Sequence, residues 1–128
     1  MAGVKLSVIA LEQLTRVMNE LEMERNDRPD AIKLAFSKGI AATSPPTEFK
    51  KEASKFEFPT SVVAKGDEIP LIRHLIIEKI GRKIEDNQLD KYILLFVEHG
   101  LMLMDQEIQE LSSADNYLLY LLEKHNIS

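Results

Sequence analysis

The sequence contains no cysteine. A chain without thiols forms no disulfide, has no thiolate nucleophile, and by itself holds neither an iron–sulfur cluster nor a cysteine-ligated zinc ion. Glycine and proline are scarce as well, with five residues of each, which argues against collagen-like, linker and disordered sequences. Of the 128 residues, 45% are hydrophobic and 29% are charged, which is enough apolar material for one hydrophobic core. We therefore expect a single domain over residues 1–128.

Long hydrophobic runs are also missing. No uninterrupted apolar stretch is longer than that of residues 92–97, which is far shorter than the roughly 20 residues that a helix needs to cross a bilayer. Residues 1–7 do not have the basic and then apolar pattern of a signal peptide. The sequence therefore predicts a cytoplasmic protein without membrane contact.

The common sequence motifs of catalysis are absent: there is no glycine-rich phosphate loop, no dinucleotide fingerprint and no nucleophile elbow. His74 and Glu78 are spaced for one helix face, but a zinc site needs a third protein ligand, and the sequence indicates none. Glu98 and His99 lie in the most apolar segment, where a polar pair is either catalytic or fixes packing and subunit register; we favour the structural role. We expect that the protein is not an enzyme and binds neither a metal ion nor a cofactor.

Helical spacing of apolar residues predicts an all-α fold, a compact bundle of about five helices with a long ordered loop at residues 43–66. The expected helix starts are marked by Ser7, Pro29, Asp67 or Glu68, Asp86, and Ser112 or Ser113. Residues 56–63 are compatible with a short strand, which Pro59 limits to a sheet edge or a bulge. The last helices carry apolar residues on most faces, so we expect partner subunits to cover part of them.

Charge is unevenly distributed along the chain. Residues 1–83 hold 14 Lys and Arg against 12 Asp and Glu, a balance of +2, whereas residues 84–128 hold 2 against 9, a balance of −7. Residues 33–65 form the most basic long stretch, with six lysines against three glutamates. Flexible ammonium groups in such a stretch can reach phosphate oxygens, and symmetric assembly would add up the contacts of several copies. The predicted DNA-binding residues are Lys33, Lys38, Lys50, Lys51 and Lys55.

In its order of elements the chain resembles the DndE family of bacterial DNA sulfur-modification (phosphorothioation) proteins. The resemblance covers roughly residues 4–108. It rests on Lys5-Leu6-Ser7 with Leu11 and Leu14, on residues 29–39 (PDAIKLAFSKG), and on a helix over residues 89–103 that contains Val97-Glu98-His99-Gly100-Leu101.

This resemblance implies a small helical homotetramer that binds double-stranded DNA, with a preference for nicked duplex. The family's members act as accessories when a backbone phosphate oxygen is replaced by sulfur, and their lysine-bearing surface binds the DNA. Persulfide transfer and cluster assembly require thiolates, which this chain lacks. The sulfur chemistry would therefore belong to partner proteins, namely the cysteine desulfurase and iron–sulfur components of the system.

Two other interpretations stay open from the sequence. The first is a ribbon-helix-helix or related transcriptional regulator, in which residues 4–6 form the DNA-reading strand and the next two helices form the dimer core. The second is an assembly or scaffold protein that docks its helices on a larger partner and binds no nucleic acid. Steep salt dependence of nucleic-acid binding would argue against the scaffold interpretation.

The lysine hypothesis predicts that replacing both Lys50 and Lys51 by Glu weakens duplex binding and leaves the oligomer intact. Fluorescence anisotropy with labelled duplex measures the affinity, and sedimentation equilibrium measures the mass. Unchanged affinity at low salt would contradict the prediction.

Overall fold

The computed structural model describes the backbone of residues 3–46 and 52–124, and their side chains as far as Leu111 together with that of Leu122. In chain order the elements are strand β1 (Gly3–Ser7), helices α1 (Val8–Glu20) and α2 (Arg28–Ala41), strand β2 (Ala53–Pro59), and helices α3 (Glu68–Ile80) and α4 (Leu89–Lys124). Short 3-10 turns precede α2, follow β2 and precede α4; they are η1 (Arg25–Asp27), η2 (Thr60–Val62) and η3 (Asp86–Gln88).

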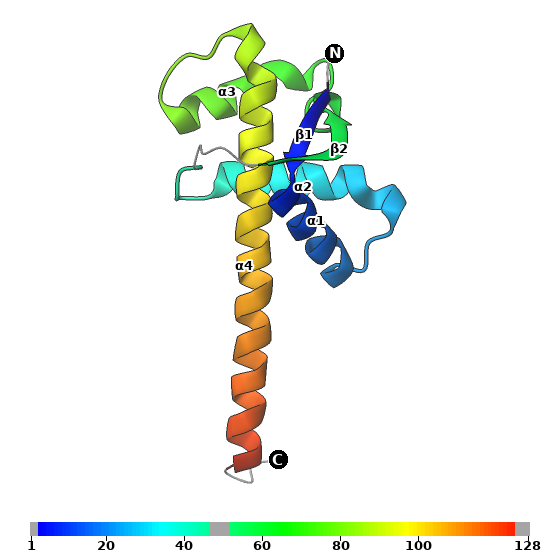
Figure 1. The fold of residues 1–128 in the computed structure, drawn as a ribbon. Helices are drawn as coiled ribbons and strands as arrows, with labels where there is room; N and C mark the ends of the chain where they lie inside the picture. Colours follow the sequence, from blue (N-terminus) through cyan, green and yellow to red (C-terminus); the bar gives the residue numbers. More distant parts are fainter. Residues whose placement is uncertain (1–2, 47–51, 125–128) are drawn as a thin grey trace.

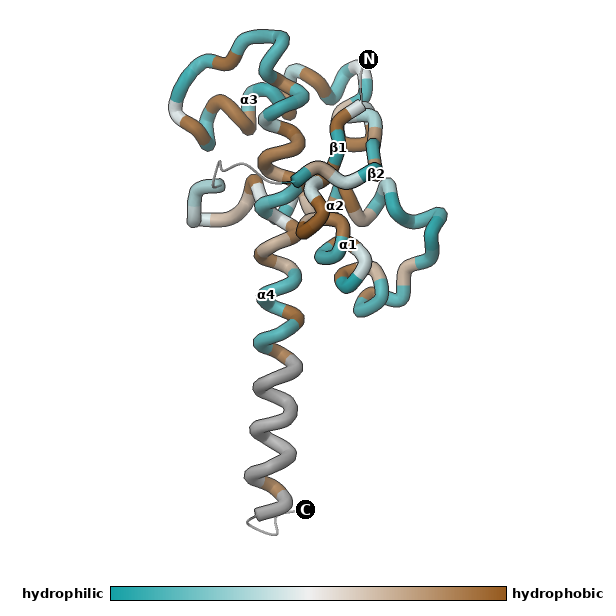
Figure 2. Tube along the Cα trace, in the orientation of Figure 1, coloured by the Kyte–Doolittle hydropathy of each residue, from teal (hydrophilic) through white to brown (hydrophobic). Residues whose placement is uncertain are grey.

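Helix α4 is the axis of the molecule, and the other elements gather around its first half (Figure 1). Helix α2 crosses it, the two strands lie on the side of α1, and the second half of α4 extends away from this head (Figure 1). Hydrophobic residues concentrate where α1, α2 and α4 meet, and the described part of α4 becomes more hydrophilic beyond that region (Figure 2). The chain thus has one core, with a long helix projecting from it.

The fold is mostly helical, as expected, but the all-α prediction is wrong because β1 and β2 form a two-stranded antiparallel sheet. Gly3 pairs with Pro59 and Lys5 with Glu57, and the register shifts between Lys5 and Ser7. The expected loop at 43–66 therefore contains both β2 and η2 among its described residues. Local patterns allowed a short strand within residues 56–63, and β2 overlaps that range. They could not show the pairing, because α1 and α2 separate the two strands in the sequence.

The bundle of five helices is also corrected: the fourth and fifth predicted helices are one continuous helix, α4, of 36 residues. Ser112 and Ser113, which we expected to cap a new helix, lie inside it. Serine is only a moderately poor helix former, and no proline or glycine follows Gly100 to end the helix. At about 1.5 Å per residue, α4 is about 54 Å long.

Helix boundaries follow local chemistry. The predicted cap at Ser7 is confirmed, since its Oγ accepts a hydrogen bond from the backbone N–H of Ala10 at 3.1 Å. Helix α3 ends at Gly81, whose positive φ of 76° is accessible to glycine at little cost. The turns before α2 and α4 carry the same device, a capping box formed by Glu24 with Asp27 and by Glu85 with Gln88.

Helices α2 and α4 cross at their glycines. A Cβ added to Gly100 would lie 1.7 Å from the backbone oxygen of Ala35, and one added to Gly39 would lie 2.1 Å from that of Phe96. Two small residues on α2, Ala35 and Gly39, are four positions apart and face Gly100 on α4. The backbones of the two helices are therefore in direct contact here. Above this contact Phe36 and Phe96 pack edge to face, with ring centroids 6.3 Å apart.

This crossing predicts that Gly100→Ala destabilises the protein by about 3 kcal/mol or more, the upper part of the range for over-packing, because the added methyl meets backbone. Helix propensity alone would favour alanine by about 1 kcal/mol, so the steric contact decides the sign. Urea unfolding measures the change. Ser37→Ala on the exposed face of α2 is the matched control and should stay within about 0.5 kcal/mol. A Gly100→Ala variant as stable as the control would refute the close crossing.

Candidate nucleic-acid interface

Two of the predicted DNA-binding lysines lie on α2 and are engaged in ion pairs. The Lys33 ammonium lies 3.1 Å from a carboxylate oxygen of Glu68 at the start of α3, and that of Lys38 lies 2.5 Å from Glu107 on α4. The backbone N–H of Lys65 and the Lys33 side chain together lower the pKa of Glu68 from its ordinary value. Five positions apart on a helix, Lys33 and Lys38 point in different directions, and the chain does not bring them together.

A third predicted lysine, Lys55, lies on β2 with its side chain exposed. Lys5 on β1 is exposed as well, and its cross-strand partner is Glu57. Two residues that pair across neighbouring strands lie on the same face of a sheet, and so do two residues that are two positions apart along one strand. Lys5 and Lys55 therefore share the outer face of the sheet with Glu57. Lys50 and Lys51, the remaining predictions, lie outside the described residues.

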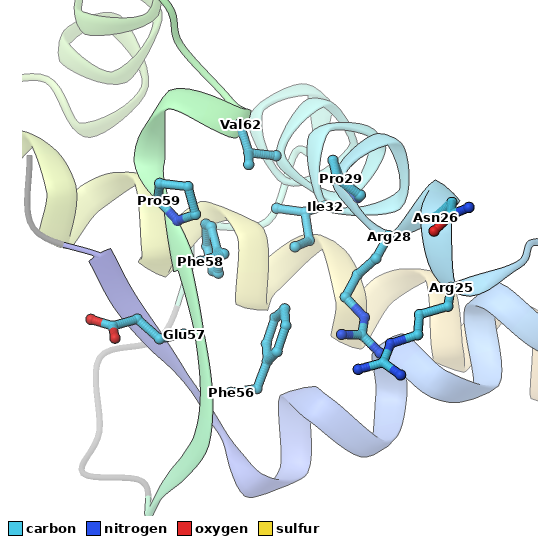
Figure 3. A pocket seen from close by; sticks show the side chains of 10 residues that line it. All are labelled: Arg25, Asn26, Arg28, Pro29, Ile32, Phe56, Glu57, Phe58, Pro59 and Val62. Carbon is cyan, nitrogen blue, oxygen red and sulfur yellow. The ribbon is translucent and has the colours of Figure 1, made fainter.

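On the other face of β2 a pocket of about 400 Å³ opens between the strand and the start of α2. Its lining residues are Arg25, Asn26, Arg28, Pro29, Ile32, Phe56, Glu57, Phe58, Pro59 and Val62. Figure 3 shows the two arginines side by side at one end of the pocket, with the Phe56 ring pointing toward them and the Glu57 carboxylate pointing away. The pocket therefore has an apolar side from β2 and a cationic side from η1 and α2.

Contacts inside the pocket fix the Arg28 side chain. Its guanidinium carbon lies 4.8 Å from the centroid of the Phe56 ring, within the range of a cation–π interaction. The rings of Phe56 and Phe58 are stacked, with centroids 6.4 Å apart. None of the ion pairs among the described residues involves Arg25 or Arg28. Both guanidinium groups thus keep their charge available to a ligand.

A second hollow, of about 190 Å³, lies between the same two arginines and α1. Its other lining residues, which include Leu14, Met18 and Met23, are mainly apolar. Arg25 and Arg28 line both pockets, so these two side chains separate the larger pocket from the smaller one.

Glu98 and His99, the polar pair of the apolar helix, both have partners in the same chain. A carboxylate oxygen of Glu98 accepts the backbone N–H of Ser7 at 2.8 Å, which joins α4 to the end of β1. His99 Nε2 lies 3.1 Å from the backbone oxygen of Ser44, in the segment after α2. These contacts tie separate elements together, as a structural role requires.

One further buried carboxylate links α4 to α1. Arg16 contacts Asp105 with two nitrogens, at 2.7 and 3.0 Å, and this hydrogen bonding raises the pKa of Arg16. His74 and Glu78 approach within 3.0 Å on the exposed surface of α3. Among the residues whose side chains the structure describes, no group of three or more potential ligands is placed to hold a metal ion. In the same part of the chain, no helix is long and apolar enough to span a membrane.

Sequence reasoning found the lysines but missed the pocket. Arg25 and Arg28 precede the basic stretch at residues 33–65 and were not among the predicted lysines. Phe56 carried no signal, because it is 31 positions from Arg25 and only the fold brings their elements together. A cation close to a proline-started helix, Arg25 before Pro29, was the available hint. No protein-family model matches the chain, and no curated protein is significantly similar to it in sequence.

The contact of Glu98 with Ser7 predicts that Glu98→Ala lowers the free energy of unfolding by about 1–3 kcal/mol, because a buried backbone N–H loses its acceptor. Glu98→Gln keeps an acceptor oxygen at this place and should lose less. Thermal or urea unfolding of both variants measures the difference. Equal stability of Glu98→Ala and the parent protein would contradict the structural assignment.

Proposed function

We propose that the chain is a non-catalytic, cytoplasmic DNA-binding protein that contacts duplex DNA as an oligomer and acts as an accessory in DNA phosphorothioation. The observation that carries DNA binding is a group of cations on and beside the two-stranded sheet that form no ion pair among the described residues. These cations are Lys5, Arg25, Arg28 and Lys55. The role in sulfur modification rests on the resemblance to the DndE family.

Charge supports this placement. The acidic excess belongs to residues 84–128, and most of those residues form α4, whose second half extends away from the head (Figure 1). Duplex DNA repels carboxylates and binds cations with release of its counterions, so the sheet side is the favourable one. Lys50 and Lys51 remain predicted DNA-binding residues and lie outside the described residues. Lys33 and Lys38 would contact DNA only after exchanging their carboxylate partners for phosphates.

Assembly is part of the proposal, and α4 supports it. Leu101, Met104, Ile108 and Leu111 follow one another at alternating steps of three and four residues. In the sequence, Leu118 and Leu122 occupy later positions of the same alternation, and Asp115 occupies the position between Leu111 and Leu118. Leu101 is buried in the head, whereas Leu111 is 65% exposed. A heptad seam that leaves the core of its own chain is typical of helices that pair with another helix. Assembly as a homotetramer, or in contact with other sulfur-modification proteins, would cover this seam.

One observation favours the second candidate, a ribbon-helix-helix type of regulator: the chain begins with the order β1–α1–α2. A two-stranded antiparallel ribbon with exposed lysines also fits the major groove in size. Against it, β1 is already paired with β2 of its own chain, so a ribbon between two copies would have to use the other edge of β1. The regulator predicts binding to a specific palindrome, and the accessory protein predicts binding that is indifferent to sequence.

The proposal predicts that Lys5→Gln with Lys55→Gln weakens duplex binding and lowers the slope of log affinity against log salt by about 2, one unit for each phosphate that the variant no longer neutralises. Anisotropy titrations of intact and nicked duplexes at several salt concentrations measure both quantities. The control is Lys79→Gln with Lys83→Gln, which removes two exposed cations on and after α3. Equal effects of the two double variants, or no duplex binding at all, would reject the proposed surface.

A further inference from the structure

We propose that the pocket between β2 and α2 binds one unpaired nucleotide, with the base inside the pocket and the phosphate at Arg25 and Arg28. This inference rests on the proposed DNA-binding function, for which it names a ligand subsite distinct from the lysines of the outer sheet face. The shared chemistry is a planar heterocycle joined to a phosphate. That chemistry can come from a DNA strand or from a free nucleotide.

Size and lining fit such a ligand. The volume of about 400 Å³ lies within the roughly 300–1,000 Å³ of pockets that take small molecules. Phe56 is half-buried, with part of its surface open to the pocket, while Phe58 is buried and closes the floor. Bases that leave a helix are held by stacking on aromatic rings and on arginine guanidinium planes. The Arg28 guanidinium already lies over the Phe56 ring, so a base would stack on the side of the guanidinium plane that faces away from this ring.

Charge determines which end of the ligand points outward. Arg25 is exposed at the mouth, and neither it nor Arg28 is neutralised by a carboxylate among the described residues. Glu57 is the lining carboxylate, and its side chain points away from the arginines (Figure 3). Two adjacent guanidinium groups can bind phosphate oxygens through paired hydrogen bonds. A neutral apolar ligand has no acceptor atoms for these donors. Asn26, also at the pocket, has an amide that can donate to and accept from a base edge.

A fully paired duplex cannot enter this pocket, because its bases are stacked and hydrogen-bonded. An unpaired base, a strand end or a base beside a backbone break has already lost part of that stacking and enters at lower cost. The pocket would therefore add affinity for such DNA over intact duplex, beyond what the lysines contribute through phosphate contacts.

The test compares duplexes that differ by one unpaired adenine. We expect the duplex with the unpaired base to bind about tenfold more tightly than the paired duplex of the same length, as stacking of one base on an aromatic ring allows. With 2-aminopurine in place of that adenine, binding should change its fluorescence. Titration with free dAMP, followed by NMR shifts of the Phe56 ring, provides an arm that needs no DNA.

Two conservative variants isolate the pocket. Phe56→Leu keeps an apolar side chain and removes the ring, and Arg28→Lys keeps the charge and removes the planar guanidinium. Each should abolish the preference for the unpaired base. Phe56→Leu, at a residue outside the duplex-binding cations, should also leave paired-duplex affinity within about twofold. Lys79→Gln, an exposed cation on α3 outside the pocket, should keep the preference. Circular dichroism and sedimentation of each variant establish that fold and oligomer are unchanged.

The outcomes separate this inference from the proposed function. Duplex binding without any preference for the unpaired base, or a preference that survives both pocket variants, overturns the nucleotide pocket and leaves the proposed function standing. If the parent protein binds dAMP at Phe56 but does not bind duplex, the pocket is supported as a site for a free nucleotide and the DNA-binding surface is rejected. If the protein binds neither duplex DNA nor dAMP, both the nucleotide pocket and the proposed DNA-binding function are overturned. A fall in oligomer mass in Phe56→Leu or Arg28→Lys would assign the pocket to a second copy of the chain and overturn the inference.

Discussion

The backbone contact between α2 and α4 is the constraint on which the rest of the structure depends. At Gly39 and Gly100 the two helices approach until no Cβ fits between them, and the large side chains of the core, such as Phe36 and Phe96, fill the space beside the contact. This approach fixes the position of α2, and therefore of its first residues, which form the cationic side of the pocket. The Glu98 contact with Ser7 fixes β1 on the same helix, two residues before Gly100. The sheet, the pocket and the crossing are thus positioned by one turn of α4.

Polar groups in this core connect separate elements of the chain. Glu98 holds the β1–α1 junction, His99 holds the segment after α2, and Asp105 holds Arg16 of α1. Each of these side chains lies on α4, and each reaches a different element. A buried polar group costs free energy unless it is hydrogen-bonded, and here each hydrogen bond also selects which element lies beside the central helix. The chemistry available to a ligand lies elsewhere, at the arginines and lysines around the sheet.

The starts of helices could be predicted from nearby residues, whereas the strand pairing, the helix crossing and the pocket could not. The Ser7 cap and the proline at the start of α2 follow from residues within one turn, and the structure has both. Pairing of Gly3 with Pro59 joins residues 56 positions apart, which periodicity cannot detect. A glycine within an apolar helix suggests a weak point, whereas Gly100 lies where α2 and α4 approach too closely for a Cβ. Charge counting identifies residues 33–65 as the most basic stretch. It could not show that Lys33 and Lys38 face Glu68 and Glu107, or that Arg25 and Phe56 share a pocket.

The continuity of α4 has a geometric consequence for anything that binds its far end. From Gly100 at the crossing to Lys124 the helix rises by about 36 Å, at about 1.5 Å and 100° per residue. A partner on the last turns would therefore be held at a fixed spacing from the sheet and at a fixed rotational phase around the helix axis. Deletion or insertion of one residue between these two regions would turn one about 100° relative to the other while both kept their own structure. The helix that organises the core thereby sets the geometry with which the head would be presented to a second molecule.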